Sequence, residues 1–325
     1  MAKGVTLILK KGGKKFDISE LVEKVKWSGR KGAAARSLQV SLLDDDGYGH
    51  DRSGIKLMSG CQLFFKYNGK ELFRGLVMKS SQSNRKMMTV TAYDNGIYLA
   101  NNRDTFMYSG ATADAIFNDI CTRYKLKVGS VAPCGYGIPE LTKPRTTAWD
   151  VICDALAQDY AATGIRHYVM SNKGKLSLIE RRVNKVQWVI ESGANLSSYT
   201  YEKSIEDIKT RVLVRSKEGD TLAFKNNGKL EKKIGIFQEI ETKSDPLEGA
   251  QAGDIIENIL KAQGKPEKSL DVEAIGKPAV ISGKAVYVII PHLNLKRTFY
   301  VDSDTHSFDD RSHMMDLKLN YYNED

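Results

Sequence analysis

The sequence predicts a mainly β protein of the α+β class, built from a β-rich module, a small α/β module and a second β-rich module. Short runs of alternating polar and apolar residues, joined by tight turns, fill residues 5–101. Between residues 109 and 181 the apolar residues recur at helical spacing. Strand-like runs return from residue 188 onward. The change of period in the middle of the chain separates the three modules.

The composition is that of an ordinary globular protein. The chain has 325 residues, of which 41% are hydrophobic and 27% charged, so two or three domains are expected. No apolar run approaches the roughly 20 residues that span a bilayer, and residues 1–9 lack an apolar stretch of signal-peptide length. We therefore expect a protein that is made and kept in a cytoplasm.

The chain is basic, with a formal net charge of +9. Such a balance suits nucleic acid, an acidic partner surface or simple solubility. The sequence contains no RNA-binding aromatic motif, no recognition-helix pattern and no zinc finger. The lysines of residues 10–15 surround Gly12-Gly13 and are interpreted as the solvated tip of a hairpin. Specific nucleic-acid binding is not predicted.

The first module shows the clearest strand and turn signals. Residues 37–42 alternate polar and apolar, which places three apolar side chains on one strand face. Residues 63–67 and 71–77 flank Asn68-Gly69, a strong hairpin signal because both turn residues need positive φ. Many short strands of this kind indicate a β-barrel or a sandwich.

Residues 44–51, with sequence DDDGYGHD, lie between two of these strands. Adjacent carboxylates and a glycine are features of calcium-binding loops. However, the acids are contiguous, no Glu occupies the last position, and the context is β rather than helical. We interpret the segment as an acidic surface loop of unknown role.

The middle module predicts two helices and a hairpin. Thr112 or Ser109 can cap a helix that begins near residue 113, and Thr147 can cap a second helix that ends near Gly164. Residues 166–170 and 175–180 then pair across a four-residue turn.

The last module returns to strands and contains one helical interruption. Residues 198–201, 210–215, 221–224, 285–290 and 296–301 are strand-like, and Asn227-Gly228 is predicted to be another hairpin turn. Residues 250–262 carry an apolar stripe at helical spacing, closed by Gly264 and Pro266.

No candidate site emerges from the cysteines and histidines, and we predict no catalytic, cofactor-binding or metal-binding residue. Cys61, Cys121, Cys134 and Cys153 form no C-x-x-C pair; Cys121 and Cys153 are expected in the core, and Cys134 is the only candidate for an exposed thiol. His167 on a strand is interpreted as structural or solvated. His306, His313, Asp304 and Asp310 could be combined into a metal site, but no histidine spacing places them on one helix face.

The sequence also lacks the motifs of common enzymes. It has no nucleophile elbow, no Walker loop and no dinucleotide fingerprint, although a carboxylate pair for glycan cleavage is a three-dimensional feature that spacing does not test. The absence of an assembled nucleophile, base and orienting group favours a component of an assembly over an enzyme.

The order of several loose motifs resembles the baseplate hub proteins of contractile phage tails, of the XkdQ/YqbQ type found in PBSX-like prophages. The resemblance covers essentially the whole chain, and the residues that carry it are 89–94, 147–152, 168–176 and 299–319. It implies two tube-like β-barrel domains, the second interrupted by a helical insertion, with a small α/β domain between them. The implied boundaries are residues 1–104, 105–186 and 187–325, with the inserted segment around 217–275.

The resemblance further implies a structural role in a virion or phage-tail-like particle that assembles in the bacterial host cytoplasm. Three copies would form a homotrimeric ring of six barrels that joins the tail tube to the central spike. The implied partners are the tail tube protein, the central spike protein, other baseplate proteins and, as a further candidate, the tape measure protein; no membrane and no cofactor are implied. The alternative function is a tail-associated cell-wall hydrolase, which would require a lytic constellation that the sequence does not show.

Overall fold

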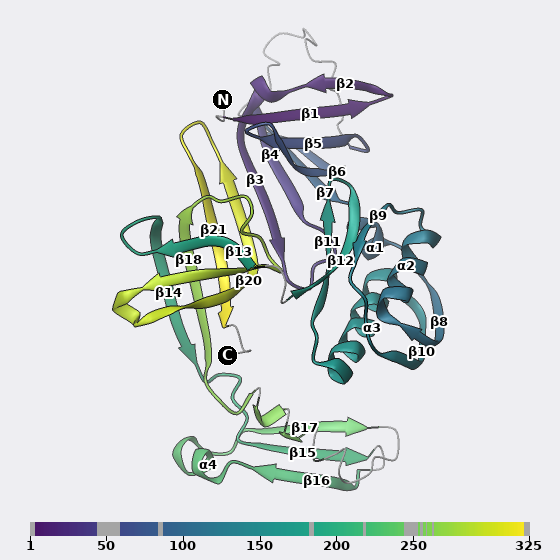
Figure 1. Cartoon of the computed structure of the whole chain (residues 1–325), viewed down its shortest axis with the longest axis vertical. Helices are drawn as coiled ribbons and strands as arrows, with labels where there is room; N and C mark the ends of the chain where they lie inside the picture. Colours follow the sequence, from purple (N-terminus) through teal and green to yellow (C-terminus); the bar gives the residue numbers. More distant parts are fainter. Residues whose placement is uncertain are drawn as a thin grey trace. The chain divides into compact units, whose positions relative to one another are not determined.

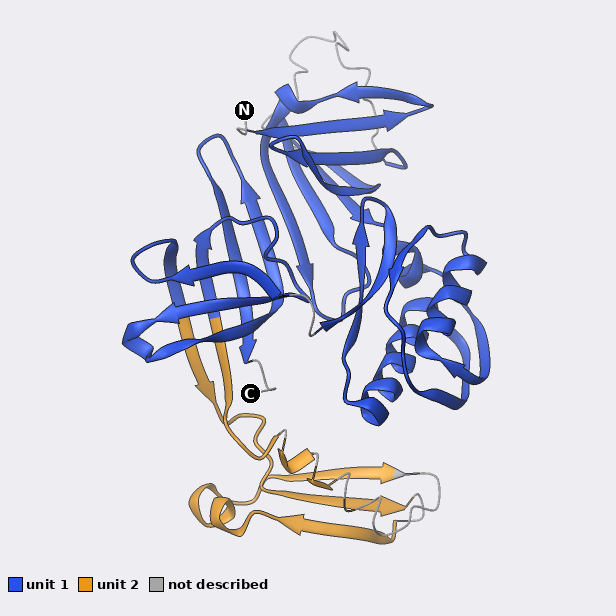
Figure 2. Cartoon of the chain, viewed as in Figure 1, with its two compact units in different colours: residues 1–199, 271–325 blue, residues 200–270 orange. Residues whose placement is uncertain are grey.

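A computed structural model describes residues 4–43, 59–83, 87–181, 185–216, 219–243, 253, 256–257, 259–261 and 263–321. The acidic segment 44–51 lies outside the described residues. The chain divides into two compact units, residues 1–199 with 271–325 and residues 200–270 (Figure 2). No helix among the described residues is long and apolar enough to cross a membrane.

Strands dominate both units, which confirms the predicted mainly β class. The strands of unit 1, or shared by both units, are β1 (Val5–Lys11), β2 (Lys14–Asp17), β3 (Val22–Arg30), β4 (Ser37–Leu43), β5 (Gln62–Tyr67), β6 (Lys70–Ser83), β7 (Met87–Asp94), β8 (Arg103–Thr112), β9 (Val128–Val131), β10 (Gly137–Thr147), β11 (His167–Asn172), β12 (Lys175–Glu180), β13 (Lys185–Glu191), β14 (Leu196–Ser204), β18 (Glu267–Ile275), β19 (Ala285–Ile290), β20 (Leu295–Phe308) and β21 (His313–Tyr321). Its α-helices are α1 (Ile97–Asn101), α2 (Ala113–Arg123) and α3 (Ala148–Thr163). Unit 2 adds β15 (Arg211–Ser216), β16 (Thr221–Asn226), α4 (Gly228–Ile234) and β17 (Gln238–Lys243).

One 13-stranded sheet runs through the first and last modules. Its strand order is β14-β18-β21-β20-β3-β4-β7-β6-β5-β1-β2 (Figure 1). In addition, β19 pairs with both β20 and β13. The two modules join where β20 pairs antiparallel with β3, from Ser303 opposite Arg30 to Phe308 opposite Val25. Phe308 is buried in the apolar core of the first module. The first and last modules therefore share backbone pairing and part of a core.

The strands fall into two sets with the same order. The N-terminal strand set reads β3-β4-β7-β6-β5-β1, and the C-terminal strand set reads β14-β18-β21-β20-β19-β13. We number the strands of each set from one to six along the chain, leaving out β2, which among the described strands pairs only with β1 at the end of the sheet. With this numbering both sets have the order 2-3-6-5-4-1. The fifth strand of each set, β6 or β20, has 14 residues. In each set the pairing between the fifth and the sixth strand shifts register once. The shift lies between Val77 and Lys79 of β6, and between Val301 and Ser303 of β20.

The two sets also differ. The first strand pairs antiparallel with the fourth in the N-terminal set, as β1 with β5, but parallel in the C-terminal set, as β13 with β19. Neither set closes into a barrel among the described strands, because β3 pairs with β20 and not with the far end of its own set. The sequence-based expectation of two barrels is therefore not confirmed.

Turn chemistry explains the local structure of the N-terminal strand set. Asn68 and Gly69 have φ of 47° and 75°, as a two-residue hairpin between β5 and β6 requires. Gly12 and Gly13 also have positive φ and connect β1 to β2, which confirms the predicted hairpin tip. The alternating residues Leu38, Val40 and Leu42 of β4 are buried, as their period of two predicts.

The middle module contains the two predicted helices and the predicted β11–β12 hairpin. Thr147 caps α3, because its hydroxyl oxygen accepts a hydrogen bond from the Asp150 amide at 3.1 Å. Gly164 ends α3 at φ 71°. Thr112 occupies the N-cap of α2 without a side-chain hydrogen bond, and Ser109 lies in β8. β8 and β10 form an antiparallel pair, with α2 and β9 between them in the chain, that the sequence did not predict.

Unit 2 is a small sheet of order β16-β15-β17 with its own apolar cluster of Val212, Val214 and Ile256. The prediction of a hairpin turn at Asn227-Gly228 is wrong. Asn227 instead caps α4, and its side-chain oxygen accepts a hydrogen bond from the Leu230 amide at 3.1 Å. The described residues between 253 and 263 are largely helical, in agreement with the predicted apolar stripe.

Candidate functional site

Unit 1 holds three features with the chemistry of a site: a buried ion pair where β20 meets β3, a cluster of three metal-ligand side chains in the middle module, and a cavity between modules.

The ion pair joins Arg36, just before β4, to Asp304 of β20. The two guanidinium nitrogens of Arg36 donate to the two carboxylate oxygens of Asp304, with an Nη1–Oδ1 distance of 2.9 Å. The Ser282 amide donates to the same carboxylate at 2.6 Å, and the Arg36 guanidinium lies 4.3 Å from the centre of the Trp27 ring. The Asp304 side chain is fully buried and that of Arg36 is 10% exposed. The pair therefore ties the connection before β4 to the C-terminal strand set in a bidentate, water-excluded contact.

Two buried histidines continue this polar layer along β20 and β21. His306 Nε2 lies 2.8 Å from the Val280 carbonyl oxygen, which can only accept, so this nitrogen carries the proton. His306 Nδ1 then accepts from His313 Nε2 at 2.9 Å. Burial lowers the pKa of both imidazoles, that of His313 to about 3. Both rings are therefore neutral near pH 7.

Three of the four residues weighed as a metal set come close together here, but their contacts are structural. Both nitrogens of His306 and both oxygens of Asp304 are engaged by protein groups, and His306 Nε2 lies 3.6 Å from Asp304 Oδ2. Asp310 is 60% exposed and contacts Arg311. These four residues therefore do not point free lone pairs toward a common position where an ion could bind.

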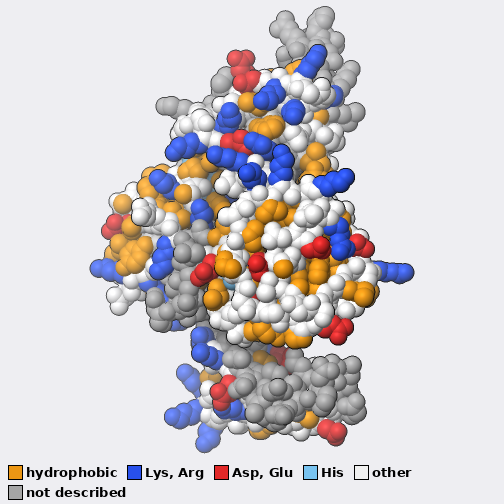
Figure 3. All heavy atoms as spheres, turned by 45° about the vertical axis from the view of Figure 1, so that its right-hand side comes forward, with side chains coloured by type: hydrophobic (Ala, Val, Ile, Leu, Met, Phe, Trp, Pro, Cys, Tyr) orange, Lys and Arg blue, Asp and Glu red, His pale blue; other side chains and the backbone are white. Residues whose placement is uncertain are grey.

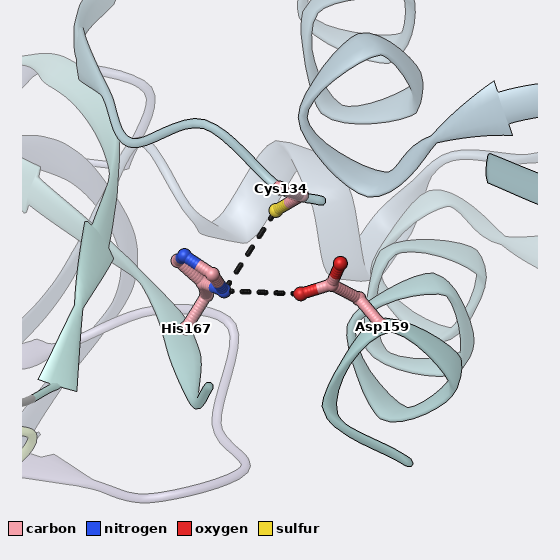
Figure 4. Close-up of side chains that lie close together, drawn as sticks. All are labelled: Cys134, Asp159 and His167. Carbon is pink, nitrogen blue, oxygen red and sulfur yellow. Dashed lines mark hydrogen bonds and ion pairs between the residues drawn. The ribbon is translucent and has the colours of Figure 1, made fainter. Parts of the chain in front are cut away.

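The second feature unites Cys134, Asp159 and His167 (Figure 4). Cys134 comes from the loop before β10, Asp159 from the C-terminal half of α3, and His167 from the first position of β11. His167 Nδ1 lies 3.7 Å from Cys134 Sγ and 3.3 Å from Asp159 Oδ2. Cys134 is 8% exposed, so the expectation that its thiol is the exposed one is wrong.

Sequence reasoning missed this cluster because its members come from a loop, a helix and a strand. One signal was available: Asp159 falls on the buried stripe of α3, four residues after buried Ala155. A carboxylate at such a position rarely stays buried without partners. Its Oδ1 accepts from the Tyr136 amide at 3.0 Å, whereas Oδ2 is buried with no hydrogen-bond partner among the described residues.

The geometry does not support nucleophilic catalysis by Cys134. A catalytic relay uses the two imidazole nitrogens separately, one for the nucleophile and one for the orienting carboxylate. Here both the thiol and the carboxylate face the same nitrogen of His167 (Figure 4). Burial, together with the charges of Asp159 and Asp114, raises the pKa of the Cys134 thiol to about 12. A thiol in this state is a poor nucleophile at neutral pH.

The third feature is a cavity of about 300 Å³ lined by residues of all three modules. Its wall includes Trp149 and Tyr160 of α3, His167 of β11, and Arg181, which also stacks on Tyr300. Asp94 adds a buried carboxyl group whose pKa is raised by burial to about 6. On the face shown in Figure 3, Lys and Arg side chains are numerous, with Asp and Glu among them.

Comparison with known proteins shows the family to which the chain belongs. A family model described as YQBQ-like matches residues 25–320. The phage-like element PBSX protein XkdQ of Bacillus subtilis (strain 168) is 33% identical over 306 residues, which cover 92% of this chain and 93% of XkdQ.

Two solved structures have the same fold at low sequence identity. The 43 kDa tail protein of prophage MuSo2 from Shewanella oneidensis superposes with a TM-score of 0.73 at 14% identity, covering 97% of both chains. A chain of the Francisella PdpA–VgrG complex gives a TM-score of 0.57 at 9% identity, covering all of this chain and 59% of that one.

Proposed function

The chain belongs to the YQBQ-like family, and from that premise we propose that it is a structural baseplate hub protein of a contractile phage tail or phage-tail-like particle. In this role three copies form a ring that joins the tail tube to the central spike. The observation that carries the proposal is the repeated strand order of the two strand sets, together with the way in which β20 binds β3.

The β20–β3 contact is a model for the contact between copies. Residues 303–308 of β20 lie beyond its register shift and pair with β3. The matching stretch of β6 begins at Lys79, beyond the register shift in that strand. Residues 78–81 of β6 have β7 on one side and no described strand on the other. This edge is the N-terminal counterpart of the edge that β3 covers.

The counterpart of β3 in the C-terminal strand set is β14, which also has nine residues. β14 ends the path of paired strands, with β18 as its one neighbour among the described strands. Pairing β6 of one copy with β14 of the next repeats the β20–β3 contact between chains. This contact is head-to-tail, and head-to-tail interfaces generate closed rings when the rotation closes. The number three follows from the family resemblance, since three copies present six strand sets to a sixfold tube.

The proposal includes the domain boundaries and the partners that the resemblance implies. Residues 1–104 and 187–325 act as the two tube-like barrel domains, residues 105–186 as the α/β domain between them, and the segment around 217–275 as the insertion. The partners are the tail tube protein, the central spike protein, other baseplate proteins and, as a further candidate, the tape measure protein. The protein works in the virion or particle after assembly in the host cytoplasm, and it is not an enzyme.

Disulfide crosslinking between copies tests the ring. Thr305 lies opposite Ser28 in the β20–β3 pairing, and the corresponding positions are Ser81 of β6 and Glu202 of β14. The variant Ser81→Cys/Glu202→Cys should therefore crosslink between chains under mild oxidation when the tube or spike partner is present. Because each copy forms two such contacts in a closed ring, the crosslinked products should end at three chains on a non-reducing gel.

The matched control is Ser81→Cys/Lys203→Cys, because adjacent strand residues point to opposite faces. This variant should crosslink much less. Native mass measurement of the assembled complex gives an independent count of copies. Products that stop at two chains, an open ladder, or a stoichiometry incompatible with three copies would reject the hub ring.

A further inference from the structure

The cluster of Cys134, Asp159 and His167 has the features of a small metal-binding site. We propose that it binds one zinc ion, which fixes the Cys134 loop to α3 and β11 inside the middle module. This proposal does not depend on the proposed ring of three copies, because all three residues belong to one chain and one module.

Two of the three donor-to-donor distances within the cluster, those from His167 Nδ1, fit tetrahedral coordination. With bond lengths of about 2.0 Å to nitrogen and oxygen and about 2.3 Å to sulfur, a tetrahedral zinc site has N–O and N–S edges of about 3.3 and 3.5 Å. The Oδ2–Nδ1 and Sγ–Nδ1 distances are 3.3 and 3.7 Å, and all three atoms lie within 4.8 Å of one another. The thiol of the loop residue Cys134 and the carboxylate of the helix residue Asp159 thus both face the same nitrogen of the strand residue His167 (Figure 4).

The hydrogen bonding of Asp159 supplies a second, independent observation. This residue is fully buried, and only its Oδ1 has a hydrogen-bond donor, the Tyr136 amide. Its Oδ2 faces His167 Nδ1 at 3.3 Å and lies near the Cys134 thiol, but neither contact has the geometry of a hydrogen bond among the described residues. A buried carboxylate oxygen without a partner is energetically unfavourable, because it has given up its hydrogen bonds to water. Metal coordination at Oδ2 removes that cost, and the Tyr136 amide then holds the carboxylate in position as an outer-sphere partner.

The donor set selects the kind of ion. A thiolate, an imidazole and a carboxylate together suit zinc, whereas the thiolate disfavours magnesium and calcium, which prefer oxygen ligands. One thiolate and one carboxylate also balance the two charges of the ion, so the buried site is neutral when filled. Binding replaces the thiol proton of Cys134, which leaves with the solvent.

The surroundings give the site support and access. The Cys134 amide donates to Asp114 Oδ1 of α2 at 3.3 Å, which orients the loop toward α3. His167, but neither Cys134 nor Asp159, lines the 300 Å³ cavity, so the cavity approaches the cluster from the His167 side. A zinc ion held by three protein ligands takes a water molecule in its fourth position.

Metal analysis of the intact protein tests the proposal. The protein is stripped with chelator, equilibrated with zinc and desalted, and zinc is then measured by mass spectrometry. Wild type should retain about one zinc per chain, and Cys134→Ser should lose nearly all of it. The matched control is Cys153→Ser, which removes a thiol from α3 outside the cluster and should retain the ion. Cobalt in place of zinc should give thiolate charge-transfer absorption in wild type and Cys153→Ser only.

A second variant guards against misfolding of Cys134→Ser. Asp159→Asn keeps the shape of the side chain and an acceptor for the Tyr136 amide, so it should fold, as judged by circular dichroism, yet bind zinc at least tenfold more weakly. Zinc should raise the melting temperature of wild type but not of Asp159→Asn. Failure of stripped wild type to take up zinc would overturn the proposal, and so would retention of zinc by both Cys134→Ser and folded Asp159→Asn.

Discussion

The N-terminal and C-terminal strand sets have the same strand order, but their fifth strands meet different surroundings. In the C-terminal set, the end of β20 is covered by β3 and carries Asp304 and His306, both buried. In the N-terminal set, the matching positions of β6 are Ser80, which is half-buried, and Gln82, which is exposed. The charged and imidazole groups at the covered strand end need hydrogen-bonding partners in the protein, because they are buried. The polar side chains at the uncovered end can be solvated by water.

The comparison also shows where the chain accepts added sequence. Between the second and third strands, the N-terminal set has only residues 31–36, whereas the C-terminal set has most of unit 2. Unit 2 contains its own sheet and apolar cluster, so it does not depend on the strand set for all of its buried surface. The repeated strand order therefore survives a large insertion at that connection.

The largest expected effect comes from breaking the buried ion pair. Asp304→Asn leaves the Arg36 guanidinium buried without a counter-charge and should destabilise the protein by about 3–5 kcal/mol in urea unfolding. The matching change in the N-terminal set, Ser80→Ala, should alter the free energy of unfolding by less than about 0.5 kcal/mol. Equal effects of the two variants would contradict the distinction between covered and uncovered strand ends.

Acid should weaken the C-terminal strand set through its neutral histidines. The folded pKa of His313, about 3, lies below the value near 6.5 of an unfolded chain. The neutral ring is therefore favoured by folding, so this contribution is complete above pH 6.5 and is lost as pH falls toward 3. At pH 4 the loss should be about 3 kcal/mol.

His313→Gln tests this pH dependence, because a Gln amide can still donate to His306 but does not titrate. Carboxyl groups titrate over the same pH range in both proteins, so the informative quantity is the difference between their stability–pH curves. The variant should show a shallower loss of stability between pH 6.5 and 4. Parallel curves would mean that His313 has the same pKa in the folded and the unfolded protein.

A smaller effect should follow from crowding the β20–β3 contact. A Cβ atom on Gly29 would lie 2.0 Å from Arg36 Nη1 and 2.9 Å from Ser282 Oγ. Because Arg36 is held by Asp304, it has little freedom to move aside, and Gly29→Ala should cost about 1–3 kcal/mol. Ser28→Ala, one residue earlier on β3, removes only the 3.1 Å hydroxyl contact with Thr305 and should cost less. A Gly29→Ala protein as stable as wild type would show that this contact is loosely packed.

Local sequence signals predicted much of this fold. Alternation and Asn-Gly chemistry located β4 and the β5–β6 hairpin, and the Thr147 cap located the start of α3. The β20–β3 pairing was not predicted, because it joins residues about 278 positions apart and no local pattern specifies it. The cluster of Cys134, Asp159 and His167 was not predicted for the same reason. No local pattern specifies it, because its members are brought together only by the packing of a loop, a helix and a strand.

The two Asn-Gly pairs give the smallest and most local test, because identical dipeptides adopt different structures in the N-terminal strand set and in unit 2. Gly69 has φ 75° in the β5–β6 hairpin, whereas Gly228 is the first residue of α4 and is not among the residues with positive φ. Gly69→Ala should therefore cost about 1 kcal/mol, because an L side chain is strained in the left-handed region. Gly228→Ala should instead stabilise α4 by up to about 1 kcal/mol, since Ala favours helix and no described atom lies within 4 Å of the added Cβ. Hydrogen exchange of the amides in each segment measures both changes. A loss of protection at α4 in Gly228→Ala would mean that Asn227-Gly228 forms the hairpin turn that its sequence alone suggests.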